Sequence, residues 1–281
     1  MTRTLLTWMG RRVVLPVALM LAAGCGSSSG TVPAAGPHGT MILATTTSTR
    51  DTGLLDVLTP RFEQQSPCGV KTLAVGSGEA LKLGTRGDAD VLLVHSPDAE
   101  GAYMSSEAGE SRTAVMHNDF VLVGPADDPA KIAATADATH AMARIATAKA
   151  PFASRADASG TNAKELKLWA AAGVTPAGGW YLKTGQGMAQ TLTIADQKRA
   201  YTLADRGTFL STRHAGLKIL TEGGTDLRNN YHVIVVKHAG TNVACARAYA
   251  TWITSRPTLK LIAAFGVAKY RQPLFFPDAK P

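Results

Sequence analysis

Residues 42–58 read ILATTTSTRDTGLLDVL and place five consecutive hydroxyl side chains, 45–49, between an apolar run and a helical pattern. The apolar residues predict a strand over about 40–46 and a helix over about 51–65. Where a strand ends and a helix begins, unpaired backbone N–H groups and the positive end of the helix dipole favour an anion. Because one hydroxyl suffices to cap a helix, the run indicates an anion site, with simple capping as the alternative.

The same alternation continues along the chain. Apolar runs at 70–76 and 89–96 enclose a helical pattern at 78–87, and the second run is almost continuously apolar, as in a strand covered on both faces. This order of strands and helices predicts a parallel sheet with right-handed crossovers. Since such sheets bind ligands at the carboxyl ends of their strands, we expect an α/β fold with its site there.

Two extended apolar segments, HNDFVLVGP at 117–125 and NYHVIVVKH at 230–238, divide the chain. We expect a first lobe made of 40–119 and 235–281, with a second lobe, 120–234, inserted into it. Each lobe is expected to be a mainly parallel sheet flanked by helices. The two crossings would act as a hinge, and the cleft between the lobes is the expected site.

Inside the second lobe the patterns predict helices over about 162–172 and 187–205 and a strand at 207–211. The polar residues within 201–208 have two readings, a cover for the cleft or packing inside the lobe. Packing is favoured, because the stretch leads into the expected strand.

Two further stretches suit an anion. Gly76, Ser77 and Gly78 stand between a strand and a helix, where glycines allow close backbone approach. Residues 154–169, SRADASGTNAKELKLW, place Arg155 just ahead of a helix, and a guanidinium offers permanent charge and a planar fork of donors. The candidate residues beside it are Ser159, Gly160 and Thr161. The alternatives are an ordinary turn for the first stretch and an Arg155–Asp157 surface ion pair for the second.

The start of the chain is typical of an export signal. Residues 1–24 combine arginines with an apolar run too short to span a bilayer. LAAGC, ending at Cys25, looks like a bacterial lipobox, so we expect cleavage before Cys25 and lipidation of that cysteine; an ordinary signal peptide is the alternative. Residues 25–39 are rich in Gly, Ser and Pro and indicate a flexible tether.

Composition excludes several classes of protein. The formal net charge of +8 is scattered, without basic runs interleaved with aromatic residues, so nucleic acid is not an expected partner. In an exported chain Cys68 and Cys245 are candidates for a disulfide, which sequence separation alone leaves open. The histidines show no metal-ligand spacing, and no GxSxG elbow is present. We therefore expect neither a cation site nor an enzyme.

Taken together in order, these stretches resemble the tungstate-binding proteins of bacterial ABC transporters. The resemblance extends from about Met41 to Pro277, and it is carried by the segments at 45–55, 74–100, 117–125, 152–169, 180–192, 200–210 and 265–277. It implies a type II periplasmic-binding fold of two lobes that close on a tetrahedral oxyanion and present it to a membrane permease.

The resemblance also implies ligand contacts at particular residues of this chain. They fall in the hydroxyl turn, the Gly-Ser-Gly loop, the arginine loop and the turn after it: Thr46, Thr47, Ser48, Ser77, Arg155, Ser159 and Thr161. The family more often has Arg-Gly-Asp and a histidine after Ser-Gly-Thr, where this chain has Ala156 and Asn162. If the usual glycine has a positive φ, Ala156 alters that backbone.

The preferred anion follows from chemistry only in part. Tungstate, molybdate and sulfate are fully ionised near neutrality and need donors, whereas hydrogen phosphate also benefits from an acceptor carboxylate. Tungstate, with molybdate next, is implied by the resemblance; the alternatives are a phosphate or sulfate receptor of the same fold, or a sensor. We expect a monomer without cofactor, periplasmic or at the cell surface, anchored in the membrane by its lipid and delivering the anion to an ABC permease.

Overall fold

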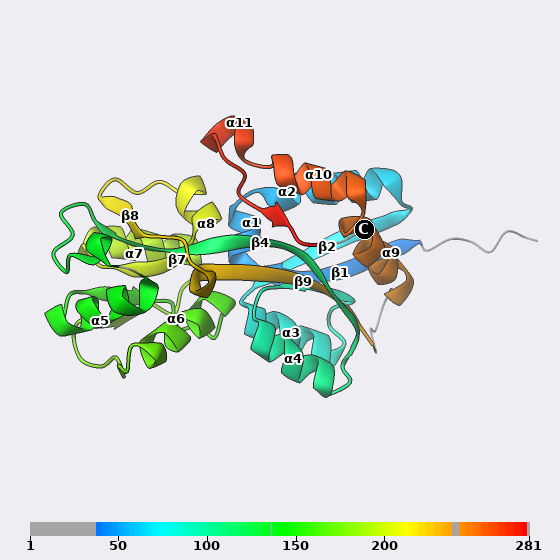
Figure 1. Ribbon diagram of the computed structural model, residues 1–281. Helices are drawn as coiled ribbons and strands as arrows, with labels where there is room; N and C mark the ends of the chain where they lie inside the picture. Colours follow the sequence, from blue (N-terminus) through cyan, green and yellow to red (C-terminus); the bar gives the residue numbers. More distant parts are fainter. Residues whose placement is uncertain (1–37, 136, 238–241, 280–281) are drawn as a thin grey trace, which may run out of the picture. The chain divides into compact units, whose positions relative to one another are not determined.

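The computed structural model describes residues 38–135, 137–237 and 242–279, shown in colour in Figure 1. The expected signal peptide 1–24, Cys25, the tether as far as residue 37 and His238 lie outside the described residues. None of the described helices has the length and apolar character that a membrane span requires. The described residues belong to one compact unit.

The first lobe is built on a sheet in which β1 pairs in parallel with β2 and β3. Its strands are β1 (Gly39–Thr46), β2 (Cys68–Val75), β3 (Val91–Val94), β9 (Arg228–Val236), the first part of β4 (Gly109–Pro125) and β10 (Phe276–Pro277). All four residues of β3 are buried, as expected for a strand covered on both faces. β1 begins at Gly39, so the last residue assigned to the tether is part of the sheet.

Helices cover both faces of this sheet (Figure 1). One face carries α2 (Leu54–Gln65), α9 (Val243–Ile253) and α10 (Arg256–Ala264); the other carries α3 (Ser77–Arg86) and α4 (Pro97–Ser105). Two short helices, α1 (Thr47–Asp51) and α11 (Val267–Tyr270), complete the lobe. Each face has its own buried apolar cluster, one around Phe62 and Tyr249 and the other around Leu92 and Ile234.

The second lobe uses the end of β4 as its central strand. β7 (Thr202–Asp205) and β8 (Leu217–Thr221) pair with it in antiparallel orientation, and β5 (Phe152–Ser154) pairs in parallel with β6 (Tyr181–Lys183). The helices are α5 (Ala138–Ala148), α6 (Gly160–Ala171), α7 (Met188–Lys198) and α8 (Arg206–Ser211), with 3-10 turns η1 (Ile132–Ala134) and η2 (Thr225–Leu227). Two apolar clusters again lie on opposite sides, one around Trp169 and one around Leu192. This lobe differs from the expected mainly parallel sheet, because β7 and β8 pair with β4 in antiparallel orientation and the parallel pair of β5 and β6 forms a separate two-stranded sheet.

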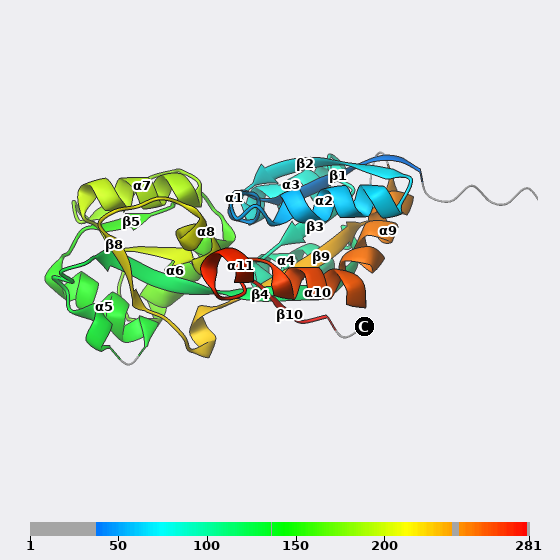
Figure 2. The same ribbon diagram turned by 90° about the horizontal axis from the view of Figure 1, so that it is seen from above.

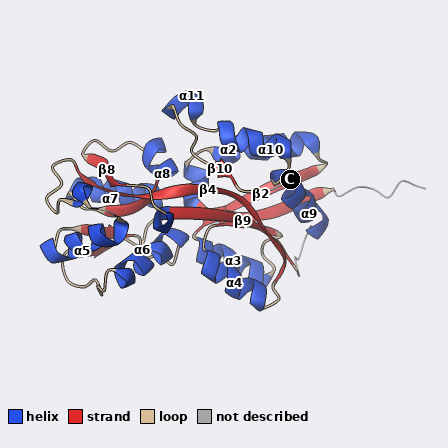
Figure 3. Ribbon diagram, viewed as in Figure 1, coloured by secondary structure: helices blue, strands red, loops and turns tan. Residues whose placement is uncertain are grey.

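Two strands connect the lobes, as Figures 2 and 3 show. Residues 109–119 of β4 pair with β9, whereas residues 120–125 pair with β7 and β8, so the chain crosses at Asp119–Phe120. The return crossing lies just before Arg228, because β9 pairs with β3 or β4 throughout its length. The sequence expectation assigned residues 228–234 to the second lobe; these pairings place them in the sheet of the first.

Two local predictions inside the second lobe are wrong. The helix expected over 187–205 ends at Lys198, where Arg199 adopts a left-handed φ of 48°, and residues 202–205 form β7. The strand expected at 207–211 is instead the helix α8, capped by Asp205. The apolar pattern of 202–205 serves antiparallel pairing with β4, a long-range contact that local periodicity does not report.

A disulfide joins the two chain segments that form the first lobe. Cys68 at the start of β2 is bonded to Cys245 in α9, with Cα atoms 5.8 Å apart and a sequence separation of 177. Both residues belong to the buried cluster around Phe62. The bond ties the closing helices to the strand that flanks β1.

Candidate functional site

The hydroxyl turn, residues 45–49, has one side chain that caps a helix and others that lie at the lobe interface. Thr46 is the N-cap of α1, and its Oγ1 accepts a hydrogen bond of 3.2 Å from the backbone N–H of Thr49. Thr47 Oγ1 is buried and has no hydrogen-bond partner among the described residues. Ser48 is fully buried. Capping therefore accounts for Thr46, whereas the hydroxyl of Thr47 remains available to a ligand.

The Gly-Ser-Gly loop leads into α3, whose first helical residue is Ser77. The Ser77 hydroxyl oxygen accepts a 3.4 Å hydrogen bond from the backbone N–H of His95. Gly76 lies against the second lobe, since a Cβ atom there would stand 3.4 Å from Ser159. The loop thus faces the arginine loop across the lobe boundary.

The arginine loop holds a buried guanidinium. Arg155 is 2% exposed, and its Nε and Nη2 donate to Asp157 Oδ2 at 3.1 and 2.5 Å. Its Nη1 donates to Thr161 Oγ1 at 3.4 Å. The Arg155–Asp157 contact predicted as an alternative is present; it is partly buried, with side-chain exposures of 2% for Arg155 and 18% for Asp157. These partners matter, because a buried guanidinium without them would be costly.

The backbone of this loop is strained at two alanines. Ala156 has a φ of 46° and Ala158 a φ of 55°, both in the left-handed region that glycine adopts at no cost. The positive φ considered for Ala156 is therefore present in this chain. Strain of this kind is maintained by the surrounding structure and is common at binding sites.

The turn after the arginine loop begins α6. Ser159 is the N-cap, and its Oγ accepts a hydrogen bond of 3.2 Å from the backbone N–H of Asn162. The backbone N–H groups of Gly160 and Thr161 belong to the first turn, where a helix offers unpaired donors and the positive end of its dipole. Both residues are buried. Gly160 contacts the first lobe, since a Cβ atom there would stand 2.5 Å from the carbonyl oxygen of His95.

His95 connects these pieces and was not predicted as a site residue. Its Nε2 lies 3.2 Å from Thr46 Oγ1 and 3.4 Å from Ser48 Oγ, and its backbone contacts both Ser77 and Gly160. Burial lowers the pKa of His95 to about 4, and the nearby charge of Arg155 acts in the same direction. The imidazole is therefore neutral near pH 7. Its position directly after β3 could have revealed it, because the hydroxyl turn follows β1 at the same edge of the sheet.

Asp205 is a second residue that the sequence left outside the site. Its Oδ1 accepts hydrogen bonds from the N–H and the hydroxyl of Thr208 at 2.8 and 2.9 Å, while its Oδ2 is buried without a partner among the described residues. Burial raises the pKa of Asp205, whereas the hydrogen bonds and the charge of Arg155 oppose that rise. Asp205 ends β7, where it pairs with Phe120 of β4 beside the crossing between the lobes.

The structure gathers the predicted residues at the boundary of the two lobes. Thr46, Ser48, Ser77 and Gly160 all contact His95, Ser159 lies against Gly76, and Thr161 contacts Arg155. Thr47 meets the second lobe at Gly187, where an added Cβ atom would stand 3.4 Å from Thr47 Oγ1. The hydroxyl oxygens of Ser77, Ser159 and Thr161 accept from protein N–H groups, so their own hydrogens stay available as donors. Such an arrangement suits a multiply charged oxyanion.

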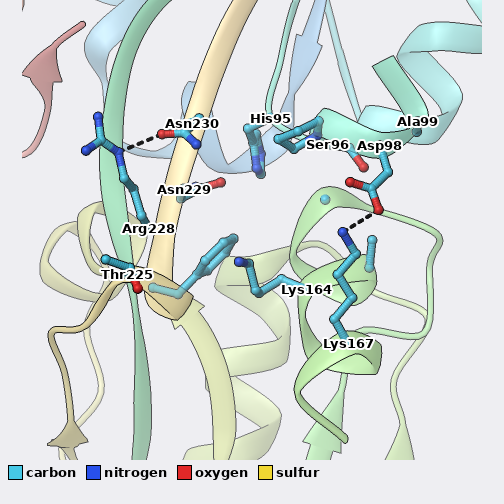
Figure 4. Close-up of a pocket in the computed structure, with 14 residues that line it drawn as sticks. His95, Ser96, Asp98, Ala99, Lys164, Lys167, Thr225, Arg228, Asn229 and Asn230 are labelled. Carbon is cyan, nitrogen blue, oxygen red and sulfur yellow. Dashed lines mark hydrogen bonds and ion pairs between the residues drawn. The ribbon is translucent and has the colours of Figure 1, made fainter. Parts of the chain in front are cut away.

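Beside this cluster lies an interlobe cavity of about 320 Å³. Figure 4 shows it between α4, α6 and the start of β9, with His95 at its upper wall. Across the described residues, no group of three or more His, Cys, Asp or Glu side chains is placed to hold a metal ion.

Two α/β lobes that meet at a cluster of anion donors define a solute-binding protein. The family model described as the PBP superfamily domain matches residues 30–257. The tungstate-binding protein TupA of Peptoclostridium acidaminophilum is 45% identical over 273 residues, covering 95% of this chain and 96% of that protein. The chain belongs to the PBP superfamily and, within it, to the family of these tungstate-binding proteins.

Solved structures agree in fold. The tungstate ABC transporter structure from Geobacter sulfurreducens is 44% identical, covers 80% of this chain and 98% of that chain, and has a TM-score of 0.74. The tungstate-binding protein TupA from Desulfovibrio alaskensis G20 is 39% identical, covers 86% of this chain and 100% of that chain, and has a TM-score of 0.70. The expected two-lobed periplasmic-binding fold is thereby confirmed.

Proposed function

We propose that this chain is an extracytoplasmic binding protein that captures a tetrahedral oxyanion, tungstate first and molybdate next, and delivers it to an ABC permease. The names of its relatives support tungstate as the cargo. The observation that carries the proposal is the buried Arg155, which contacts Thr161 at a lobe interface where the hydroxyls of Ser77, Ser159 and Thr161 keep their hydrogens available. Binding and release require no covalent bond to be made or broken. We propose that the oxyanion is transported cargo and that the protein uses no cofactor.

The mechanism uses the two lobes as the two sides of the site. Thr47, Ser48 and Ser77 come from the first lobe, whereas Arg155 and the turn at 159–161 come from the second. An anion that contacts both sides has a higher affinity for the closed arrangement and therefore shifts the population toward it. The permease would then recognise the closed form.

A specific observation favours phosphate as a second candidate. Asp205 Oδ2 is a buried acceptor without a partner among the described residues, and hydrogen phosphate can donate its proton to such an oxygen. Of the carboxyls considered from sequence, Asp157 is engaged by Arg155 and Asp51 by Arg50. Asp205→Asn separates the candidates, because the exchange would weaken phosphate binding and leave tungstate binding within about two-fold.

The experiment is calorimetric titration of the chain without residues 1–24 against tungstate, molybdate, sulfate and phosphate. We expect tight binding of tungstate and molybdate and much weaker binding of sulfate, because a smaller tetrahedron leaves the donors too distant. A response to phosphate alone would replace the proposed cargo. No response to any of the four anions would remove the oxyanion function.

Anchoring and assembly belong to the same proposal. We propose that Cys25 is lipidated and that the protein is a monomer located outside the cytoplasm. The alternative to an importer component is a sensor that presents the same closed form to a regulatory partner. Cys25→Ser tests the anchor: the variant should lose its lipid in intact-mass spectrometry and leave the membrane fraction. Loss of tungstate uptake on deletion of the chain would favour the importer.

A further inference from the structure

The interlobe cavity beside the oxyanion cluster has its own set of polar groups. Its volume of about 320 Å³ falls in the range of small-molecule sites and exceeds the needs of one tetrahedral oxyanion. The first turn of α4 forms one wall, α6 the opposite wall, and Phe120 with the start of β9 the floor. Gly160 and His95, which touch each other, line this cavity and also belong to the oxyanion cluster.

Two lysines of α6, one turn apart, point into the cavity (Figure 4). Lys167 forms an ion pair with Asp98 of the first lobe. Lys164 Nζ donates only to a backbone carbonyl, that of Asp226 at 2.8 Å, and lies 6.0 Å from the centre of the Phe120 ring. Among the described residues no carboxylate is within ion-pair distance of Lys164, so the carboxylates of Asp226 and Asp98 act on its ammonium only from farther away.

The environment of Lys164 disfavours its charged form. Its pKa is lowered by burial and, next, by the like charge of Lys167, while the charges of Asp226 and Asp98 oppose this shift. A bound anion would offset both effects, since it would replace lost hydration and screen the repulsion between the two ammonium groups. Arg228 contributes less, because Figure 4 shows its guanidinium directed toward Asn230, to which it donates at 2.8 Å.

Neutral polar groups complete the lining. The His95 ring points into the cavity in Figure 4, and its Nδ1 is buried with no hydrogen-bond partner among the described residues. Asn229, 2% exposed, and Asn230 line the side of β9; the Asn229 amide nitrogen donates to Asn118 and Tyr231, and the Asn230 amide oxygen accepts from Arg228. Ala99, Ala163 and the Phe120 ring supply apolar wall, which suits a short carbon skeleton.

We propose that this cavity is a second anion site, in which Lys164 and Lys167 hold the carboxylate or oxyanion group of a small anion between α4 and α6. The site is separate from the oxyanion site proposed above and binds more weakly, because its cations are partly solvated. An occupant would contact both lobes and would therefore stabilise their closed arrangement. The charged group could belong to a small organic acid or to a second copy of the oxyanion.

Calorimetry and amide NMR of the chain without residues 1–24, first saturated with one equivalent of tungstate, test this proposal. Succinate and excess tungstate are the two probes, and both should shift the side-chain amide signals of Asn229 and Asn230 if the site accepts any small anion. A shift with excess tungstate alone would identify the oxyanion, and a shift with succinate alone the organic acid. No saturable shift with either probe would overturn the proposal.

Matched variants locate the effect. Lys164→Gln should weaken this second binding step by at least about ten-fold, whereas Lys218→Gln, which removes the same charge from an exposed lysine of β8, should change it by less than two-fold. Equal weakening in both variants would reduce the effect to general charge and contradict the site. Arg155→Ala should abolish the first tungstate step and retain the succinate step. Loss of both binding steps in that variant would mean that the cavity is not a separate site. If the unaltered chain bound succinate but not tungstate, only the proposed function would be refuted.

Discussion

Gly78 of the first lobe and Ala158 of the second lie so close that a Cβ atom on the glycine would stand 2.7 Å from the carbonyl oxygen of Ala158. No real Cβ contact is this short, and the neighbour is backbone, which cannot rotate away. The lobes therefore meet here only because residue 78 has no side chain. The closeness of the Gly-Ser-Gly loop and the arginine loop depends on this contact.

Gly78→Ala should weaken oxyanion binding by about ten-fold or more, because the lobes must separate to accommodate the methyl group. The melting temperature without ligand should change little, since each lobe keeps its own core. Gly101→Ala is the matched control: Gly101 is a glycine of α4 with no heavy atom within 4 Å of the added Cβ. Equal affinities in the two variants, measured by calorimetry, would show that this contact is not needed for binding.

Arg155→Ala should lower oxyanion affinity by at least about a hundred-fold, because it removes the charge at the centre of the site together with several donors. Arg155→Lys should recover only part of the loss, since an ammonium lacks the planar fork. The variants are compared by calorimetry, and circular dichroism checks the fold. An affinity near that of the unaltered chain would exclude Arg155 from the site.

Ala156→Gly should raise the free energy of unfolding by about 0.5–1 kcal/mol, because relief of the positive φ outweighs the extra freedom of glycine in the unfolded chain. The control is Ala171→Gly near the end of α6, where the same exchange should cost about 1 kcal/mol. Urea denaturation measures both. A destabilised Ala156→Gly would contradict the assignment of strain to this residue.

Acid should destabilise the protein through His95. The folded pKa is about 4, below the unfolded value of about 6.5, so between these values the unfolded chain binds a proton that the folded chain does not. The free energy of unfolding should therefore fall by up to about 3 kcal/mol as the pH drops from 6.5 to 4. Burial raises the pKa of Glu165 and Asp205, and these groups act in the opposite direction.

The contribution of His95 is isolated by comparison with His95→Asn. The difference in unfolding free energy between the two proteins should shrink as the pH falls through this window. NMR titration measures the pKa of the His95 imidazole directly in the folded protein. Parallel stability curves together with an ordinary imidazole pKa would contradict the burial effect.

Removal of the disulfide should cost about 2–5 kcal/mol, since the bond between Cys68 and Cys245 closes a long loop in the unfolded chain. The double variant Cys68→Ser, Cys245→Ser should melt at a lower temperature than the oxidised protein. A reductant should lower the melting temperature of the unaltered chain and leave that of the double variant unchanged. Insensitivity of both proteins would mean that the bond adds no stability.

Local sequence patterns were enough to single out the three stretches that the structure brings together at the lobe boundary. In each case the signal lies within a few residues: an apolar strand, small or hydroxyl residues at its end, and a helix that begins directly afterwards. Ser159 caps α6 and Thr46 caps α1 for the same local reason. The alternation of strands and helices in residues 40–96 likewise predicted the parallel core, because burial on both faces leaves a continuous apolar run.

Contacts between distant residues decided the rest. Whether residues 202–205 form a strand depends on β4, and whether β9 belongs to the first sheet depends on β3; neither partner is near in sequence. The role of His95 arises because its ring reaches Thr46 and Ser48 after the chain has folded. The cavity beside Lys164 exists only where the lobes face each other. The sequence by itself therefore determined the turns and their chemistry, which depend on neighbouring residues, while the tertiary structure alone decided which turns meet, because that depends on distances between segments far apart in the chain.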